Sequence, residues 1–437
     1  MLASSLSVRE RSVPRWFYTI ILRLVFPLIW LRLWLRGRKS PAYRLRWRER
    51  MGLSSQQRPS RQPLWVHAVS VGETLAAQPL IAAIRAQYPN LPLLITTMTP
   101  TGSERVRAIW GDSVQHVYAP YDYPSAIERF LRHWQPCALV VMETELWPNT
   151  LAAMKAKQLP VLLANARLSE RSARGYAKAD ALTRELLTAI TRIAAQDEAT
   201  AARFRALGMP PELVVVTGSL KFDLTISPEQ FALAEAWRAQ RGLQDRPIWV
   251  AASTHAGEDA LMLAAHNQLL KALPSALLIL VPRHPERFDA VARQVQTAGL
   301  RVLRRSSSEA VSPNTQVWLG DSMGELLSYL SLAQVAFVGG SLVPTGGHNA
   351  LEPIALGVPT LTGPHDFNFA TINAELRAAG ALQTVHDAEA LAGALTQLFT
   401  DQAQRDAQIS AGLAVLEMNR GAVARQMTLL SRLLGRA

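Results

Sequence analysis

The residues of this chain that could do chemistry stand directly after short apolar runs. The run at residues 64–69 is followed by Ser70, Val71, Gly72 and Glu73. Gly72 permits a tight turn, so we expect Glu73 to open the next helix, where its carboxylate could take a proton from a substrate hydroxyl. The alternative is a first-turn glutamate that complements the helix dipole, which would lower the pKa of its carboxyl. The spacing leaves both interpretations open.

Two acids, Glu143 and Glu145, follow the apolar run at residues 138–142. A pair of carboxylates at a strand end is costly unless the pair is hydrated or used. A purely structural alternative is that these acids cap the helix expected to begin near Pro148.

Lys221 follows a further apolar run at residues 213–218. An ammonium group in this place could meet a phosphate or stabilise a negative charge that develops during a reaction. Alternatively, Lys221 could pair with Asp223 at a hinge between domains.

The second half of the chain offers a larger cluster. Arg283 and His284 stand at the end of the apolar run at residues 276–282 and suit an anionic ligand. The sequence Asp-Ser-Met-Gly-Glu at residues 321–325 is expected to begin a helix after another apolar run.

A glycine-rich stretch follows, in which the glycine pairs 339–340 and 346–347 let the backbone approach a ligand closely. His348 and Asn349 are expected to open a helix whose N-terminus favours a phosphate. Glu352 lies one helical turn later and could accept hydrogen bonds from ribose hydroxyls. The structural alternative is a glycine-rich turn followed by a capped helix. It leaves unexplained why so many polar groups stand at successive strand ends.

A regular alternation of apolar runs and amphipathic segments must position these groups. The predicted strands lie at residues 64–69, 92–97, 115–119, 138–142, 160–164, 192–196 and 213–218, and at 247–253, 276–282, 300–304, 315–320, 334–340 and 358–363. Continuous apolar strands separated by helices are typical of parallel sheets covered on both faces. The sequence therefore predicts an α/β fold with two doubly wound, Rossmann-like domains and a boundary between about residues 222 and 246. Such domains bind ligands at the carboxyl ends of their strands, here in a cleft between the domains.

The charge of the chain is concentrated at its beginning. Of 46 basic and 34 acidic residues, 14 basic and two acidic ones lie in residues 1–61, so the formal net charge of +12 belongs to this leader and the remainder balances to zero. That distribution excludes a nucleic-acid binder whose whole body is basic. Cys137 is the only cysteine, which excludes a disulfide framework and a cysteine-based zinc site. We expect the body to lie in the cytoplasm.

The leader contains a run of twenty residues, 16–35, of which sixteen are apolar. As a helix this run would just span a bilayer core of about 30 Å, but Arg23, Pro27 and Arg32 interrupt it. A cleaved signal peptide is disfavoured because the run is too long and no small-residue cleavage site follows. A buried structural helix remains an alternative. We favour a membrane anchor followed by an arginine-rich stretch at residues 36–50 that anionic headgroups attract, with the choice between a shallow helix and a span left open.

Several motifs are absent. No D-x-D pair occurs, which disfavours a metal-held sugar nucleotide, and neither a P-loop nor a G-x-G-x-x-G after the first strand is present. P-loop kinases and ordinary dehydrogenases therefore lose support. The histidines have no metal-ligand spacing, and His67 and His116 are expected to be satisfied structural histidines.

Seven motifs, in this order, resemble the 3-deoxy-D-manno-octulosonic acid (Kdo) transferases of lipopolysaccharide synthesis in Gram-negative bacteria. They are WVHAVSVGE, METELWPN, ANARLSERS, VTGSLKFD, VPRHPERF, GDSMGEL and GGHNALEPIALGVP. The resemblance runs from about residue 60 to the C-terminal helices. It implies a GT-B fold in which a membrane anchor at residues 1–61 precedes an acceptor-binding domain at 62–222. A linker at 223–246 then leads to a CMP-sugar-binding domain at 247–437 whose terminal helices pack back.

The same resemblance implies transfer of Kdo from CMP-Kdo to lipid IVA, the lipid A precursor, with inversion and with neither a metal nor another cofactor. The enzyme would sit on the cytoplasmic face of the inner membrane, against an anionic surface and without a nucleic-acid partner. Glu73 would be the general base, and Glu143 and Lys221 would stabilise the transition state. The residues that would hold CMP are Pro282, Arg283, Met323, Gly324, Glu325, Asn349, Ala350, Leu351 and Glu352. The choice of Glu143 over Glu145 rests on the resemblance.

Two other functions are compatible with the residues. One is a different GT-B transferase or an epimerase that acts on a UDP-sugar. The other is a membrane-tethered nucleotide-binding scaffold without catalysis.

Overall fold

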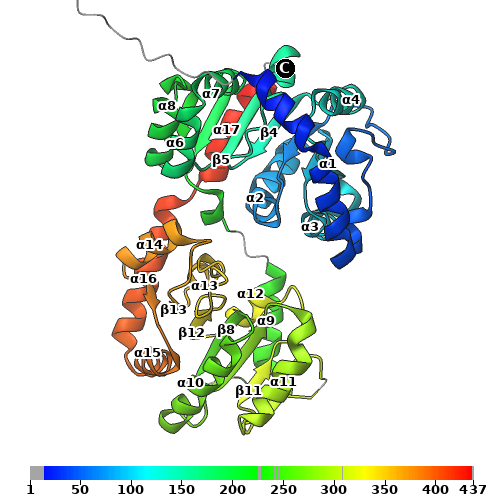
Figure 1. The fold of residues 1–437 in the computed structure, drawn as a ribbon. Coiled ribbons are helices and arrows are strands. Elements are labelled where there is room, and N and C mark those ends of the chain that lie inside the picture. Colours follow the sequence, from blue (N-terminus) through cyan, green and yellow to red (C-terminus); the bar gives the residue numbers. More distant parts are fainter. Residues whose placement is uncertain (1–13, 225–227, 241–242, 244–245, 308, 436–437) are drawn as a thin grey trace, which may run out of the picture. The chain divides into compact units, whose positions relative to one another are not determined.

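The computed structural model describes residues 14–224, 228–240, 243, 246–307 and 309–435. It divides into two compact units. Unit 1 comprises Met1–Asp223 and Gly421–Ala437, and unit 2 comprises Leu224–Arg420. Each unit is built on a parallel seven-stranded sheet (Figure 1), so the predicted doubly wound α/β class is confirmed.

In unit 1 the sheet has the order β3-β2-β1-β4-β5-β6-β7. The strands are β1 (Leu64–His67), β2 (Leu93–Thr97), β3 (Gln115–Tyr118), β4 (Ala138–Met142), β5 (Val161–Ala166), β6 (Arg192–Ala195) and β7 (Val214–Val216). All seven predicted strands of the first half are present. The strand order reverses between β1 and β4, and the crevice at such a switch point is where these sheets bind ligands.

Two hydrophobic cores cover the two faces of this sheet, because alternate strand side chains point to opposite sides. One core joins β1 side chains such as Leu64 and Val66 to α2 (Val71–Gln87), α3 (Pro100–Trp110) and α17 (Ala422–Leu434). The other joins Trp65 to the helices of the opposite face. These are α4 (Pro124–Trp134), α5 (Pro148–Ala156), α6 (Glu170–Lys178), α7 (Asp180–Leu187) and α8 (Glu198–Ala206).

In unit 2 the order is β10-β11-β9-β8-β12-β13-β14, with the switch point between β8 and β12. The strands are β8 (Ile248–Thr254), β9 (Leu277–Pro282), β10 (Val302–Arg304), β11 (Val317–Leu319), β12 (Val335–Val338), β13 (Thr360–Thr362) and β14 (Leu382–Thr384). The helices are α9 (Pro228–Gln240), α10 (Glu258–Ala272), α11 (Phe288–Thr297), α12 (Leu326–Leu330), α13 (Leu351–Ala355), α14 (Ala370–Ala378), α15 (Ala388–Thr400) and α16 (Gln402–Asn419). Six of these strands were predicted, and the short edge strand β14 was not.

The segment 223–246, expected to be a linker, contains the helix α9. Trp237 of this helix is buried in unit 2, where its ring centroid lies 5.3 Å from that of Trp318 and 4.9 Å from that of Tyr329. A linker was predicted here because the apolar runs pause and a polar stretch follows the helix. The polar stretch at residues 241–245 lies outside the described residues, apart from Leu243.

The chain returns to unit 1 at its C-terminus, where α17 packs against α2 and beside β5 and β6. Asp223 caps α17, because its carboxylate accepts hydrogen bonds from the backbone N–H groups of Gly421 (2.7 Å) and Val423 (2.6 Å). Gln426 of α17 is fully buried and bonds the backbone N–H of Asn165 and the hydroxyl of Thr217.

The leader forms α1 (Arg15–Lys39) and the short helices η1 (Pro41–Arg44) and η2 (Glu49–Met51). By length and composition α1 is able to cross a membrane. The leader charges Arg9, Glu10 and Arg11 lie outside the described residues.

Candidate active site

Glu73 lies in the first turn of α2, immediately beyond the carboxyl end of β1. Its carboxylate accepts hydrogen bonds from the Val69 backbone N–H (2.8 Å) and the Ser70 hydroxyl (2.9 Å), and only 8% of the residue is exposed. Ser70 in turn caps the helix by accepting from the Glu73 N–H. Gly72 lies inside this first turn with a helical backbone, so the tight turn does not require a glycine. The carboxylate is thus held in one orientation at the switch point of the sheet.

Burial raises the pKa of Glu73 to about 8, although the hydrogen bonds from Val69 and Ser70 oppose the shift. The negative charges of Glu145 and Glu143 raise it further. The sequence left two interpretations of Glu73 open: a proton acceptor in catalysis, or a first-turn residue that complements the helix dipole and has a lowered pKa. Glu73 does stand in the first turn, but its pKa moves upward because desolvation outweighs the favourable helix terminus. A carboxyl with a pKa near the working pH is suited to exchange protons with a substrate.

Glu143 follows β4 directly, on the strand next to β1. Its backbone N–H donates to the carbonyl oxygen of Ala164 (3.0 Å), which holds the residue in a left-handed conformation with φ of 55°. A non-glycine residue in this region costs about 1–3 kcal/mol, and such strain gathers at functional sites. Glu145, by contrast, accepts a hydrogen bond from the indole of Trp147 in its own loop (2.9 Å).

The helix that follows Glu143 and Glu145 along the chain, α5, is capped by a residue from another loop. The N-terminus of α5 is capped by Asp122, whose carboxylate accepts from the backbone N–H groups of Asn149 (2.9 Å) and Thr150 (2.7 Å). The alternative that Glu143 or Glu145 caps α5 is therefore wrong, because the carboxylate of Asp122 takes this role.

Lys221 lies in η5 (Leu220–Phe222), beyond the carboxyl end of β7. Burial lowers the pKa of its ammonium group, the charge of Glu143 raises it, and the charge of Arg167 lowers it. The charge of Glu143 thus acts on both Lys221 and Glu73, so the three side chains of unit 1 are electrostatically coupled. Asn165 helps to fix η5 by accepting from the Leu220 N–H (3.0 Å).

In unit 2 the switch point between β8 and β12 is organised by Glu258, which sequence reasoning missed. Glu258 is fully buried and accepts hydrogen bonds from four backbone N–H groups. The donors are those of His255 (2.9 Å), Gly340 (2.6 Å), Ser341 (2.9 Å) and Leu342 (2.9 Å). The glycine-rich turn after β12 is therefore wrapped around a carboxylate that belongs to α10.

Two histidines lie against this turn. The Nε2 atoms of His255 and His348 are 2.9 Å apart, and their rings stack with centroids 5.1 Å apart. Burial lowers the pKa of His348 to about 4, with the charges of His255, Arg283 and His284 acting in the same direction. Arg283 and the three imidazoles thus gather at one strand-end site that suits an anion.

Arg283 is positioned by its backbone, because its N–H donates to the carbonyl of Thr254 (3.0 Å) directly after Pro282 ends β9. This bond ties the carboxyl ends of β8 and β9 together. The charge of Arg283 lowers the pKa of both His255 and His348, so it acts on the site that the two histidines occupy.

The turn before α12 places Met323, Gly324 and Glu325 together. Met323 is 58% exposed, and Gly324 has φ of 84°, a left-handed conformation that glycine adopts readily. Glu325 accepts hydrogen bonds from Arg305 (3.0 Å) and Ser322 (2.5 Å), so its carboxylate is fixed.

The helix expected to open at His348 begins later, at Leu351, and has only five residues. Asn349 precedes it, where its side-chain oxygen accepts from the Leu351 N–H (3.2 Å) and its amide donates to Glu352 (3.4 Å). Ala350 is the N-cap residue. Hydrogen bonds therefore join Asn349 to Leu351 and Glu352, which are all predicted nucleotide-binding residues. A helix of five residues has only a small dipole, so its N-terminus adds little attraction for a phosphate.

A signal for Glu258 was present in the sequence. The strand β1 is followed by Ser-Val-Gly-Glu at residues 70–73, and the strand β8 by His-Ala-Gly-Glu at 255–258. In both units the glutamate enters the first turn of the next helix at the switch point. The predicted placement of the active site in a cleft between the domains stays a prediction.

Comparison with known proteins agrees with this architecture. The family described as 3-deoxy-D-manno-octulosonic-acid transferase (kdotransferase) matches residues 45–224, and the glycosyl transferases group 1 match residues 263–414. The chain is 45% identical over 428 residues to the 3-deoxy-D-manno-octulosonic acid transferase of Haemophilus influenzae, covering 97% of this chain and 99% of that protein. It is 39% identical to the protein of the same name from Bordetella pertussis, covering 96% and 100%.

The fold is also found in a solved structure with little sequence identity. A glycosyltransferase from Rickettsia africae matches with a TM-score of 0.53 at 13% identity, covering 86% of this chain and all of that one. This likeness supports the GT-B fold class. Together with the sequence matches over nearly the full length, it shows that the chain belongs to the 3-deoxy-D-manno-octulosonic acid transferase family of GT-B glycosyltransferases.

Proposed function

We propose that the protein transfers a Kdo residue from CMP-Kdo to lipid IVA on the cytoplasmic side of the inner membrane, with inversion and without a bound metal. The observation that carries the mechanism is Glu73, a buried carboxyl at the switch point of unit 1 whose pKa is raised to about 8. The substrates are those implied by the sequence resemblance.

In this mechanism Glu73 in its ionised form takes the proton of the acceptor hydroxyl. The resulting oxygen attacks the anomeric carbon of Kdo from the face opposite to CMP, and the bond to the phosphate oxygen breaks. A base of raised pKa holds the abstracted proton more firmly than an ordinary carboxylate, and general-base catalysis contributes about 10²–10⁴-fold. The ammonium of Lys221, beside Glu143, stabilises charge that develops during the displacement.

Unit 2 is suited to the leaving CMP. Arg283 supplies positive charge, and the imidazoles of His255, His284 and His348, which gather near it, can supply N–H donors; a phosphate that gains charge is stabilised by such groups. The carboxylates of Glu325 and Glu352 are acceptors that fit ribose hydroxyls.

The membrane attachment uses α1. Arginines of the leader that face outward attract anionic headgroups by about 1 kcal/mol each. Two leader arginines are excluded from this role, because Arg46 and Arg50 are built into unit 1, with Arg50 only 1% exposed.

The direct experiment incubates purified protein in detergent with CMP-Kdo and lipid IVA and identifies the product by mass spectrometry. We expect a mass increase of whole Kdo units, insensitive to EDTA, and none with UDP-sugars as donors. Product formation from a UDP-sugar would favour the alternative transferase, and binding of CMP without any product would favour the scaffold. The same spectrum counts the Kdo units added.

A further inference from the structure

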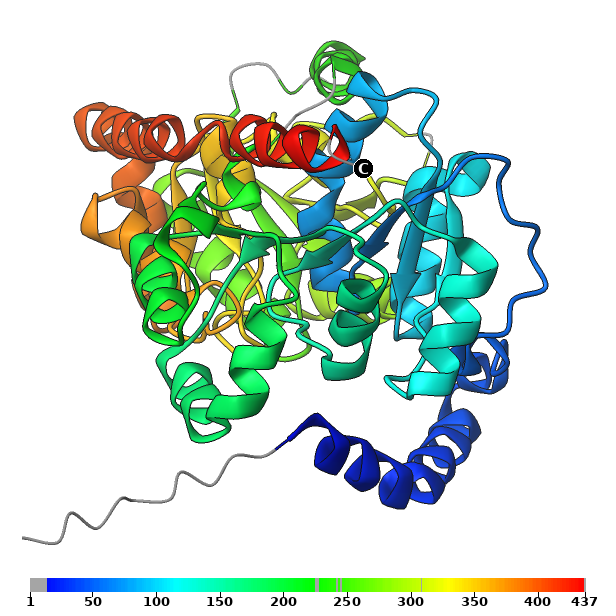
Figure 2. The same cartoon turned by 90° about the horizontal axis from the view of Figure 1, so that it is seen from above.

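The first helix, α1, contacts unit 1 along one stripe of its surface and leaves the opposite stripe uncovered. We propose that α1 lies in the plane of the membrane surface, docked on its own catalytic unit, and that it does not cross the bilayer. This inference rests on the membrane attachment proposed above and specifies its geometry. Figure 2 shows α1 as the outermost helix on its side of unit 1.

The first turns of α1 are bonded to α5, to α7 and to Asp122, which precedes α4. The Arg15 guanidinium contacts Glu185 of α7 (2.7 Å) and the side-chain oxygen of Asn149 (3.0 Å). The Tyr18 hydroxyl donates to Asp122 (3.1 Å), and Thr19, which is buried, donates to Asn149 (3.1 Å). The helix therefore begins beside α5, the helix that follows the loop of Glu143 and Glu145.

The same stripe stays in contact further along the helix. The Tyr123 hydroxyl donates to the backbone carbonyl of Leu22 (2.8 Å), and the ring of Phe26 meets that of Tyr123 at 5.5 Å. Trp30 then packs edge-on against Trp47, with ring centroids 4.6 Å apart. Positions 15, 18, 19, 22, 26 and 30 repeat at intervals of three or four, which is one face of a helix.

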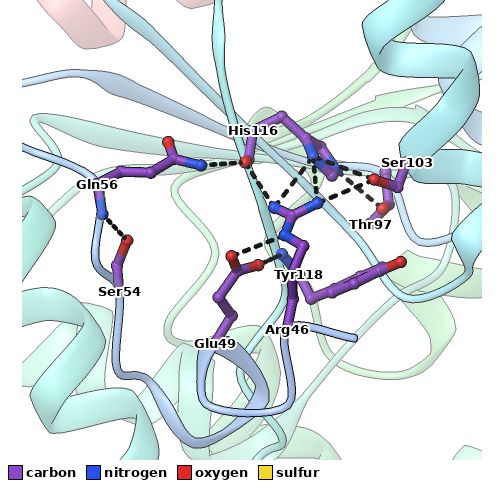
Figure 3. A network of polar contacts seen from close by, with 8 residues as sticks. All are labelled: Arg46, Glu49, Ser54, Gln56, Thr97, Ser103, His116 and Tyr118. Atoms are coloured by element: carbon purple, nitrogen blue, oxygen red, sulfur yellow. Dashed lines mark hydrogen bonds and ion pairs between the residues drawn. The ribbon is translucent and has the colours of Figure 1, made fainter. Parts of the chain in front are cut away.

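Beyond α1 the chain is fastened to the edge strand β3. Arg46 bonds Glu49 (2.8 Å), Ser103 (3.1 Å) and the carbonyl of His116 (2.8 Å), and Glu49 accepts from the backbone N–H of Tyr118 (2.8 Å) (Figure 3). Burial, reinforced by the charge of Arg46, lowers the pKa of His116 to about 3, so the neutral imidazole adds no repulsive charge to this network.

Both ends of α1 are thus held by one folded unit. A helix of 25 residues is about 37 Å long, and a helix that spans a bilayer has its two ends on opposite sides. Contacts of Arg15 with Glu185 at one end and of Arg46 with β3 beyond the other end cannot both exist in a spanning helix whose catalytic unit is on one side. A helix α1 that is docked on unit 1 in this way therefore cannot also cross the bilayer.

The uncovered stripe is apolar, and its residues are each at least 37% exposed. They are Trp16, Phe17, Ile20, Ile21, Leu24, Val25, Leu28, Leu31, Trp34 and Leu35. Leu24, the most exposed at 73%, marks the middle of this face. A contiguous apolar face of this size on a protein surface indicates a lipid or protein partner.

The arginines inside the apolar run identify the partner as an anionic bilayer. At about 100° per residue, Arg23 lies about 100° to one side of Leu24 and Arg32 about 80° to the other. Both side chains are exposed, so they flank the apolar face at the level that lipid headgroups occupy when that face is immersed. In a spanning helix Arg23 would instead lie deep in the hydrocarbon, at a cost of about 2.5–3.5 kcal/mol.

The test measures depth along the helix. Single cysteines are placed in the full chain carrying Cys137→Ser, labelled with a fluorophore, and quenched by brominated lipids in phosphatidylglycerol/phosphatidylethanolamine vesicles. We expect equal, shallow depth for Phe17→Cys, Leu24→Cys, Leu28→Cys and Leu35→Cys, and no quenching for the docked position Leu22→Cys. A depth that is greatest near residues 24–28, decreases toward both ends and includes position 22 would show a spanning helix and overturn the proposal.

A charge variant gives effects of opposite sign for the two geometries. For a helix in the plane, Arg23→Gln weakens binding to anionic vesicles about fivefold, the equivalent of about 1 kcal/mol per basic side chain. For a spanning helix the same change removes an unfavourable charge, so membrane retention would stay equal or rise. Arg174→Gln on α6 is the control that loses the same charge, because Arg174 is exposed and its ion pair with Glu170 lies within its own helix.

The proposed function is tested by a separate measurement. Activity on lipid IVA in detergent micelles reports the chemistry without a bilayer, so transfer in micelles with a spanning depth profile overturns only the geometry of α1. Absence of transfer in micelles together with a flat, shallow profile overturns only the proposed function. A wild-type protein that fails to bind vesicles overturns the in-plane proposal directly.

Discussion

Ser70 and Glu73 hold each other in place: the Glu73 backbone N–H donates to the Ser70 hydroxyl at 3.2 Å, and that hydroxyl donates back to the Glu73 carboxylate at 2.9 Å. This is a variant of the capping box, in which the third residue of a helix returns to its N-cap. The carboxyl proposed as the base is therefore also part of a helix cap. A variant that tests its chemistry must keep its shape.

Glu73→Gln keeps that shape and removes the ability to accept a proton. We expect the transfer rate to decrease by about 10²–10⁴-fold, while CMP binding, which depends on unit 2, is unchanged. Rates from product formation and CMP affinity from calorimetry check this. Glu145→Gln is the matched control nearby, with a smaller loss. Near-normal turnover of Glu73→Gln would show that another group is the base.

The raised pKa of Glu73 predicts the pH dependence of catalysis. Because the base must be ionised and its pKa is about 8, we expect log(kcat/KM) to rise with a slope near one up to about pH 8 and then level off. The profile is measured with saturating CMP-Kdo and limiting acceptor. A plateau that begins near pH 5 would mean that Glu73 ionises as an ordinary carboxyl.

The same pKa predicts a cost in folding stability. The carboxyl has its usual pKa of 4.5 when unfolded and about 8 when folded, so the unfolded chain binds fewer protons between these values. The contribution of Glu73 is fully present below pH 4.5 and is lost as the pH rises to about 8. Glu73→Gln does not ionise, so its melting temperature relative to wild type should increase between pH 5 and pH 8. An unchanged difference across this interval would contradict the raised pKa.

Arg283→Ala should weaken CMP binding. Arg283 directly follows β9, and its charge acts on His255 and His348. Hydrogen bonds to charged groups contribute about 1.5–3 kcal/mol, which corresponds to roughly a 10- to 150-fold higher dissociation constant. Calorimetric titration with CMP measures it. Arg293→Ala, an exposed arginine on α11, should leave the affinity as it is. An equal affinity for both variants would remove Arg283 from the site.

Glu258→Ala should destabilise unit 2. The change leaves four backbone N–H groups, two of them fully buried, without their acceptor, and losing the charged partner of buried groups costs about 3–5 kcal/mol. Denaturant unfolding measures the loss, with the exposed Glu286→Ala as the control. If Glu258→Ala unfolded at the wild-type midpoint, water would have to satisfy these groups in its place.

The sequence predicted the parallel sheets well, because buried parallel strands are continuous apolar runs that stand out between helices. It missed β14, whose three residues include Gln383 and Thr384 and give no apolar run. It missed α9 because the apolar residues of this helix form no continuous run: Ala234 and Trp237 are buried, while Phe231 is 45% exposed.

The site was predictable in part. The positions of Glu73, Glu143, Lys221 and Arg283 directly after apolar runs identified them as candidate site residues, since the carboxyl ends of the parallel strands of one sheet share one edge. Arg283 belongs to the sheet of unit 2 and the other three to that of unit 1. Glu258 was overlooked because a glutamate in a first helical turn normally faces water, and only the folded glycine turn reveals its four donors. The upward shift of the Glu73 pKa could not be predicted either, since it depends on the burial of the carboxyl and on the charges of Glu143 and Glu145, which follow another strand.

The return of α17 to unit 1 has a consequence for how the protein is made. Leu430 and Leu433 of this helix complete a core of the first unit, but residues 224–420 must be synthesised before α17 follows. At about 5–20 residues per second the ribosome needs about 10–40 s for that stretch. During this interval the nascent first unit has an open face beside β5 and β6, and α1 with its exposed apolar stripe is already outside the ribosome. Capture of α1 by the membrane during translation would keep this half-finished unit away from other nascent chains until its last helix arrives.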